Sequence, residues 1–256
     1  MSSQRSLLPK GRHKPRSGMS QSRHMIQAVP GAGKTTFANT WPSPVFLATE
    51  PGTHLMEAAE VEIRSWPQFL QALDELEYTD HPYKTVVIDT VDNLYARCTE
   101  HVCELLGGVT HVSEVPYRGW DVLKSTWTKG IHRVASLRAK SGAKLCILFI
   151  GHTKAEPVMK SVGGKAVETG KTNYRSSLPS SGRGILHSAI DFLYAVEIDE
   201  EGKRWLITQP HETPEARYEA KGRGTPGQML PARLPMDFDT LRGAFEDAFG
   251  AKKGAK

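Results

Sequence analysis

The stretch Ala28-Val-Pro-Gly-Ala-Gly-Lys-Thr35 decides the fold of this chain of 256 residues. It fits the phosphate-loop pattern G-x-x-x-x-G-K-[ST] at every fixed position except the first, where Ala28 replaces glycine. Residues 24–28 before it are typical of a short strand, and residues 34–39 after it are typical of a helix. This order indicates a loop that binds nucleotide phosphates and disfavours a chance glycine-rich turn.

The residue types of this loop suit phosphate chemistry. Gly31 and Gly33 carry no Cβ, so backbone N–H groups can face the phosphates, and Lys34 can reach the β and γ oxygens. Thr35 offers a hydroxyl to Mg²⁺, and the N-terminus of the following helix adds about half a positive charge. Guanine recognition would need an Asn/Thr-Lys-x-Asp element where the sequence has His152-Thr-Lys-Ala. We therefore predict ATP and Mg²⁺ as cofactors.

Two acidic residues follow apolar runs that are typical of buried strands. Thr85-Val-Val-Ile-Asp89 places a carboxylate at a strand end, where it can hold the hydration shell of Mg²⁺. Glu50 follows the run 45–48 and can activate water if its strand neighbours the phosphate-loop strand; the alternative is a solvated acid. The predicted cofactor-binding residues are Pro30, Gly31, Ala32, Gly33, Lys34, Thr35, Thr36 and Asp89, with Thr35 and Asp89 at the metal.

Short apolar runs alternate with longer amphipathic patterns, which predicts an α/β fold with a mostly parallel central sheet flanked by helices. The run 145–150 is the most hydrophobic and is expected at the centre of the sheet. Residues 192–198 and 204–208 are expected to form a C-terminal β-hairpin that turns at Glu201-Gly202. Helices are predicted over 65–76, 91–106, 120–139 and 239–249, and a further strand over 85–88.

Composition indicates in which cellular compartment the protein is expected and whether it spans a membrane or binds a metal. The longest apolar run has six residues, far fewer than the roughly 20 that a membrane-spanning helix needs, so no membrane span is expected. Three cysteines without paired spacing favour a reducing, cytoplasmic setting. Cys98, His101, Cys103 and His111 invite a metal interpretation, but ordinary helix packing is favoured because their spacing lacks a C-x-x-C pair.

The net charge of +5 is unevenly distributed. Residues 1–25 carry six basic and no acidic residues, which leaves a balance of −1 for the rest of the chain. We interpret 1–24 as a disordered basic arm, with a nucleic-acid-binding role, a targeting role and a solvated leader all open, and 251–256 as a basic tail. Within a single domain spanning 25–250, residues 151–184 contain six basic and two acidic residues and are predicted to form a mobile loop.

Three strand-end motifs carry a resemblance to a known family. Phe46-Leu-Ala-Thr-Glu50, Val86-Val-Ile-Asp-Thr90 and Leu148-Phe-Ile-Gly-His152 resemble successive strands of the RecA-like ATPase core. More narrowly, residues 30–38, 83–94 and 119–120 resemble phage-encoded nucleotide-binding proteins of the RecA-core type, a P-loop ATPase family that includes single-strand-annealing recombinases. The similarity runs from about residue 25 to residue 249.

The resemblance implies roles for residues outside the phosphate loop. It makes Glu50 the catalytic base and Asp89 the acid associated with Mg²⁺, and it places His152 where a polar sensor feels the γ-phosphate. Lys221-Gly-Arg223 resembles the Lys-x-Arg element that RecA-like ATPases insert into a neighbouring subunit's site, which would require a ring or filament. A structural histidine and a solvated basic turn are the alternatives. The predicted catalytic residues are Lys34, Glu50, His152, Lys221 and Arg223.

The resemblance also places residues 151–184 where RecA-like proteins bind single-stranded DNA, the alternative being a solvated loop. Lys and Arg side chains can neutralise phosphates, and the one aromatic residue can stack on a base. The predicted nucleic-acid-binding residues are Lys154, Lys160, Lys165, Lys171, Tyr174, Arg175 and Arg183.

We therefore expect an oligomeric, DNA-dependent ATPase that binds single-stranded DNA and promotes annealing or recombination. Its expected partners are single-stranded DNA, further copies of the chain and a single-strand-binding protein, in the cytoplasm of a bacterial host if the protein is phage-encoded. Two other classes stay open: a nucleotide-gated replication loader or scaffold with little hydrolysis, and a small-molecule kinase, although no Arg-bearing lid is legible in the sequence.

Deletion of residues 1–24 tests the basic arm. We expect ATP hydrolysis to be unchanged and the salt dependence of DNA affinity to become shallower, by at most about 0.7 in log–log slope for each lost phosphate contact. Binding to single-stranded DNA across a salt series measures this slope. An unchanged slope would show that the arm does not touch DNA.

Overall fold

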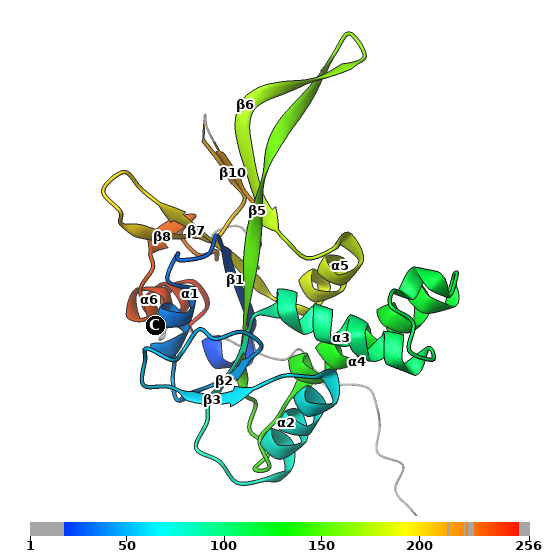
Figure 1. Cartoon of the computed structure of the whole chain (residues 1–256). Coiled ribbons are helices and arrows are strands. Elements are labelled where there is room, and N and C mark those ends of the chain that lie inside the picture. The colour runs from blue at the N-terminus through cyan, green and yellow to red at the C-terminus, as the bar shows by residue number, and fades with distance from the viewer. Residues whose placement is uncertain (1–17, 214–215, 223, 225–227, 251–256) are drawn as a thin grey trace, which may run out of the picture.

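The computed structural model describes residues 18–213, 216–222, 224 and 228–250, so the predicted basic tail, Arg223 and most of the predicted arm lie outside the described residues. The main sheet has the strand order β11-β8-β7-β1-β5-β4-β2-β3 (Figure 1). Neighbours from β7 to β3 are parallel, and β8 and β11 add an antiparallel edge. The strands are β1 Arg23–Ala28, β2 Pro44–Ala48, β3 Ala59–Glu62, β4 Thr85–Asp89, β5 Cys146–Val162, β7 Phe192–Ile198, β8 Arg204–Ile207 and β11 Arg233–Pro235.

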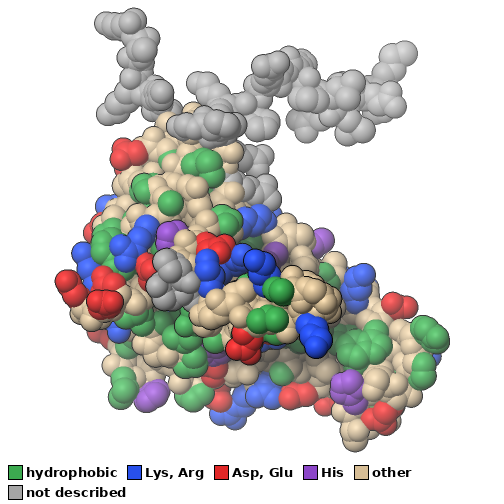
Figure 2. Space-filling model, turned by 90° about the horizontal axis from the view of Figure 1, so that it is seen from above, with side chains coloured by type: hydrophobic (Ala, Val, Ile, Leu, Met, Phe, Trp, Pro, Cys, Tyr) green, Lys and Arg blue, Asp and Glu red, His purple; other side chains and the backbone are tan. Residues whose placement is uncertain are grey.

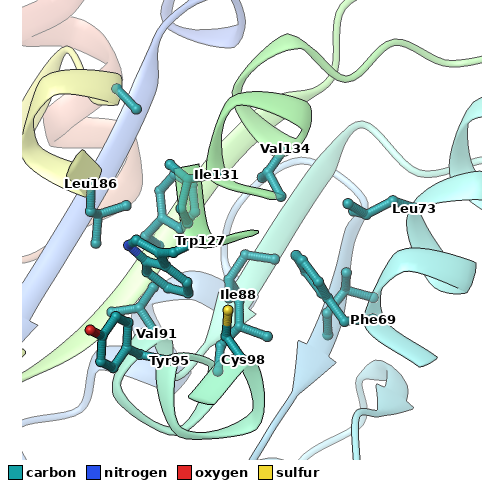
Figure 3. Close-up of a cluster of buried hydrophobic side chains, with 14 of the residues drawn as sticks. Phe69, Leu73, Ile88, Val91, Tyr95, Cys98, Trp127, Ile131, Val134 and Leu186 are labelled. Atoms are coloured by element: carbon teal, nitrogen blue, oxygen red, sulfur yellow. The ribbon is translucent and has the colours of Figure 1, made fainter. Parts of the chain in front are cut away.

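Helices cover both faces of this sheet, because strand residues alternate between two hydrophobic clusters. One cluster packs strand residues such as Phe46 and Leu148 against α1 and α6. The other packs Leu47, Ile88 and Phe149 against α2 to α5, and Figure 3 shows part of it. The helices are α1 Lys34–Asn39, α2 Trp66–Tyr78, α3 Val91–Leu105, α4 Arg118–Ser136, α5 Ser180–Ala189 and α6 Phe238–Phe249.

This architecture confirms the predicted α/β fold class with a mostly parallel central sheet flanked by helices. The most hydrophobic strand, β5, lies between β1 and β4, and β7 and β8 form the predicted C-terminal hairpin. Local signals also placed helix ends well: the side chain of Ser65 caps α2 by accepting from Gln68 N–H, and Pro67 lies in the first turn. In α4 the ends differ from the prediction by two or three residues, within the usual uncertainty of helix ends.

The prediction of a mobile loop over 151–184 is wrong. After its first six residues, which are buried, β5 continues as one strand of a long antiparallel hairpin with β6 Lys165–Ser176, and α5 follows (Figure 1). The hairpin turns at Gly163-Gly164, where both φ angles are positive (59° and 79°), as a tight two-residue turn requires. The hairpin is exposed on both sides, so its strands lack the apolar alternation that reveals a half-buried strand.

Several short elements were not predicted from the sequence. They pair at edges or cap loops, where hydrophobic pattern is weak. These are β3, β11, β9 His211–Glu212, β10 Ala216–Tyr218 and the 3₁₀ turns Met19–Gln21 and Val112–Glu114. Through β10, which pairs with β6 and β9, the hairpin joins a second small sheet.

The cysteine-rich stretch is helix packing, as favoured. Cys98 and Cys103 lie on α3 and are buried and free. Among the described residues, no group of three or more His, Cys, Asp or Glu side chains is arranged to hold a metal ion. In the same part of the chain, no helix is both long and apolar enough to cross a bilayer.

Gly130 of α4 offers a test of the core. A Cβ there would overlap the buried ring of Trp66, so we expect Gly130→Ala to destabilise the protein by about 1–3 kcal/mol. For a chain of this size that lowers Tm by roughly 2–4 °C per kcal/mol, as a thermal melt would show.

Gly243 on α6 is the matched control. Apart from its own helix backbone, no atom of the described residues lies within 4 Å of a Cβ built there, so Gly243→Ala should leave Tm unchanged or raise it slightly through helix propensity. Equal melting temperatures for wild type and Gly130→Ala would contradict the packing described here.

Candidate nucleotide site

Gly31 and Gly33 shape the phosphate loop. Their φ angles are 79° and 84°, in the left-handed region that favours glycine. Ala28 instead is the last residue of β1 and has extended backbone, which explains why alanine can stand at the first position of the motif. The loop enters α1 at Lys34, as predicted.

The ammonium of Lys34 lies within this loop. Its Nζ donates hydrogen bonds to the carbonyl oxygens of Ala28 and Val29, each at 3.1 Å. Burial lowers the pKa of Lys34, and the carboxylates of Asp89 and Glu50 oppose that shift. The lysine is therefore a buried cation that faces the carboxylates of the site.

Thr35 and Asp89 form the part of the site that suits Mg²⁺. Thr35 Oγ1 donates to Asp89 Oδ2 at 2.8 Å, while Asp89 Oδ1 is buried without a hydrogen-bond partner among the described residues. Burial raises the pKa of Asp89 to about 6. A hydrated cation would satisfy Oδ1 and favour the ionised carboxylate, so these residues fit Mg²⁺. When bound, the ion would neutralise charge on the phosphate oxygens.

Glu50 reaches the site from a strand that does not neighbour the phosphate-loop strand, so the condition on which its role was predicted is not met. β5 and β4 lie between β1 and β2. Thr49 fastens the ends of β2 and β4 together: its N–H donates to the carbonyl oxygen of Asp89 at 2.6 Å, and its hydroxyl donates to that of Thr90 at 2.9 Å. Because parallel strands end at one edge of the sheet, Glu50 still lies close to Asp89.

Three side chains contact the carboxylate of Glu50, and the weakest contact is the 3.5 Å hydrogen bond that the Thr90 hydroxyl donates to Oε2. Glu50 Oε1 lies 3.3 Å from His152 Nε2, and Asn93 Nδ2 donates to Oε2 at 2.8 Å. The hydrogen bond between Glu50 and His152 lowers the pKa of Glu50 and raises the pKa of His152. At a pH between the pKa of Glu50 and the pKa of His152, the carboxylate is ionised and the imidazole is protonated, so the two form an ion pair. This ion pair is lost as the pH rises through the pKa of His152. Glu50 is thus ionised at neutral pH, as a group that orients or deprotonates water must be.

Asp92 is a site residue that the sequence analysis did not single out. In the first turn of α3, its Oδ2 accepts from the N–H of His152 at 2.8 Å, and its Oδ1 accepts from the Ser177 hydroxyl. Ser177 N–H in turn donates to the carbonyl oxygen of His152 at 3.0 Å. Asp92 therefore fixes the point where the hairpin leaves and rejoins the body. In the sequence, Asp92 is marked only by its position at the start of a predicted helix, and acidic residues are common at helix starts because they interact favourably with the helix dipole.

A family model described as an AAA domain matches residues 20–223. This span includes the phosphate loop, Glu50, Asp89 and His152 and makes up most of the chain. The chain belongs to this AAA domain family. Family membership and the geometry of the phosphate loop together indicate a domain that binds and hydrolyses a nucleotide.

No curated protein matches this chain. Among solved structures, the crystal structure of a KaiC-like protein from the hyperthermophilic archaeon Pyrococcus horikoshii OT3 is similar, with a TM-score of 0.38 and 13% identity. That match covers 74% of this chain and 78% of the other. Both similarity values are low, so family membership rests on the match over residues 20–223.

Lys221 lies apart from the phosphate loop of its own AAA domain. Its Nζ donates to the carbonyl oxygens of His187 and Ile190, at 2.5 and 2.8 Å, at the end of α5. Its backbone forms a bridge with Leu193 of β7. A role in a neighbouring subunit's site stays a prediction for Lys221, and Arg223 lies outside the described residues.

The predicted DNA-binding residues lie on the hairpin and α5, away from the phosphate loop. Near the base of the hairpin, Lys154 and Arg175 both pair with Glu156, at 2.9 and 2.5 Å. Lys171 pairs with Glu212 at 2.7 Å. The ring of Tyr174 stacks on that of Tyr218, with centroids 5.4 Å apart. Arg183 is on α5, and Lys160 and Lys165 lie close to the hairpin turn.

Glu50→Gln tests the catalytic role of the carboxylate in the AAA domain. The variant keeps the size of the side chain but cannot take a proton, so we expect ATP affinity within about threefold of wild type and hydrolysis reduced by roughly 10²–10⁴-fold. Calorimetric binding and steady-state phosphate release measure the two.

Lys34→Ala is the contrasting variant, since it removes the ammonium from the loop and should abolish nucleotide binding itself. Turnover by Glu50→Gln at the wild-type rate would remove Glu50 from the mechanism.

Proposed function

We propose that this AAA domain is an ATPase that binds single-stranded DNA through the β5–β6 hairpin and promotes annealing or recombination as a ring or filament. One observation carries the proposal: β5 is a single strand that runs from the centre of the nucleotide-binding sheet into the hairpin. His152, which contacts Glu50, lies at the junction. A residue beside the nucleotide and a basic projection thus belong to one continuous element.

The end of the hairpin offers a surface suited to a nucleic-acid strand. Lys160 and Val162 lie opposite Val167 and Lys165 in the antiparallel register, so these four side chains share one face. Both valines are about half exposed. Lysines can neutralise phosphates while the valines contact bases or sugars without reading sequence. Figure 2 looks down on this end of the molecule and shows Lys and Arg side chains near its centre with hydrophobic ones beside them.

Nucleotide state would act on the hairpin through a short route. The γ-phosphate would lie near Lys34 and Glu50, and Glu50 contacts His152 directly. Asp92 binds both the His152 backbone and Ser177, the residue that follows β6. A change in the partner of Glu50 would therefore reach both strands of the hairpin at their base.

A second function is favoured by the same exposed valines. Exposed apolar side chains on a projecting hairpin also suit a protein partner, as a nucleotide-gated replication loader or scaffold would require. In that case DNA need not stimulate hydrolysis.

The test is the ATPase rate with and without single-stranded DNA, for wild type and for Lys160→Glu/Lys165→Glu. We expect DNA to stimulate the wild type at least several-fold, and the double variant to lose this stimulation while keeping its basal rate, since neither lysine lies near the phosphate loop. Binding measured against salt should show a shallower slope, because phosphate contacts are lost.

Lys124→Glu/Lys129→Glu is the matched control. Both lysines are exposed on α4, and the change in net charge is the same. If both double variants weaken DNA binding equally, net charge rather than the hairpin is responsible. Wild-type hydrolysis that DNA does not stimulate would favour the loader or scaffold.

A further inference from the structure

Arg204 lies against the phosphate loop although it is far away in sequence. A Cβ built on Gly33 would be 3.3 Å from Arg204 Nε and 3.7 Å from its Cζ. Arg204 is the first residue of β8 and pairs with Ile198 at the end of β7. Since β7 runs parallel to β1, this end of the β7–β8 hairpin lies at the sheet edge where the phosphate loop begins.

The guanidinium of Arg204 is available for a ligand. Its side chain is exposed, and it has no ion pair or side-chain hydrogen bond with any residue in the described part of the chain. Neighbouring cations are engaged otherwise: Lys203 Nζ lies 4.3 Å from the centre of the Trp205 ring, and Arg233 pairs with Glu197 at 2.6 Å. A guanidinium that packs on a phosphate-binding loop without a carboxylate partner suits an anion.

The strand order indicates which end of a nucleotide Arg204 would meet. β5, β4 and β2, which lead to His152, Asp89 and Glu50, lie on one side of β1, while β7 and β8 lie on the other. Mg²⁺ and the γ-phosphate belong on the acidic side, next to Thr35 and Asp89. The inner phosphates and the nucleoside would then extend toward β8.

We propose that Arg204 is a nucleotide-binding residue that pairs, within its own chain, with the α- and β-phosphates. It therefore binds the part that ATP and ADP share, not the phosphate that is transferred. The proposal requires nucleotide binding by the AAA domain and does not depend on DNA binding.

The experiment measures dissociation constants for ATP and ADP in wild type, Arg204→Met, Arg204→Lys and Lys203→Met. We expect Arg204→Met to weaken both nucleotides by about tenfold, the lower end for a charge-assisted contact at an exposed site. Its turnover at saturating ATP should stay within about twofold of wild type, because the lost contact is equal in ground and transition states. Arg204→Lys should recover most of the affinity, and Lys203→Met should bind like wild type.

Other results would overturn the proposal. Loss of ATP affinity with unchanged ADP affinity, or a large fall in turnover, would place Arg204 at the γ-phosphate. Arg204→Lys as weak as Arg204→Met would indicate stacking of the planar group on the base, and unchanged affinity in Arg204→Met would exclude any contact. Failure of wild type to bind nucleotide, judged against Lys34→Ala, would contradict the nucleotide site itself and not Arg204 alone.

Discussion

The hydrogen bonds that Asp92 makes to His152 and Ser177 fix the geometry on which the site depends. They hold β5 at the position where it leaves the core sheet, and so they set the distance from His152 to Glu50. Gly151 allows this close approach, because a Cβ there would press on Met25 and Val91. One side chain thus aligns the buried sheet, the carboxylate of Glu50 and the projecting hairpin.

The electrostatics of the site are unbalanced within the protein alone. Lys34 is a single buried cation that faces Asp89, Glu50 and Asp92. The three carboxylates have different partners. Asp92 accepts two hydrogen bonds and Glu50 pairs with His152, whereas Asp89 has one oxygen without a partner among the described residues and a raised pKa. Bound Mg²⁺ would neutralise the negative charge of Asp89 and the charge of the phosphate chain beside it. The least satisfied acid is therefore the one placed for the metal.

Local pattern predicted the parts of the fold that local physics controls. The phosphate loop, α1 and β4 follow from the glycine-rich turn and from buried apolar runs, and all lie where expected. The adjacency of the Glu50 strand was not predictable, because strand order is a long-range property that two intervening strands decide. Nor was Arg204, which meets Gly33 through the packing of β8. The hairpin was missed because exposure on both sides removes the alternation that marks strands, although Gly163-Gly164 was a usable turn signal.

Replacing the expected loop by a hairpin changes how a nucleotide signal would travel. A mobile loop would absorb a small movement of His152 within a few residues. β5 instead continues from His152 to Val162 and pairs with β6, with one irregularity in the register between Pro157 and Met159, while β6 pairs with β10 near the base of the hairpin. Cross-strand ion pairs such as Arg175 with Glu156 add stiffness just beyond the junction. A rotation at His152 would therefore move both strands at the base of the hairpin together, because strand pairing and ion pairs join them there.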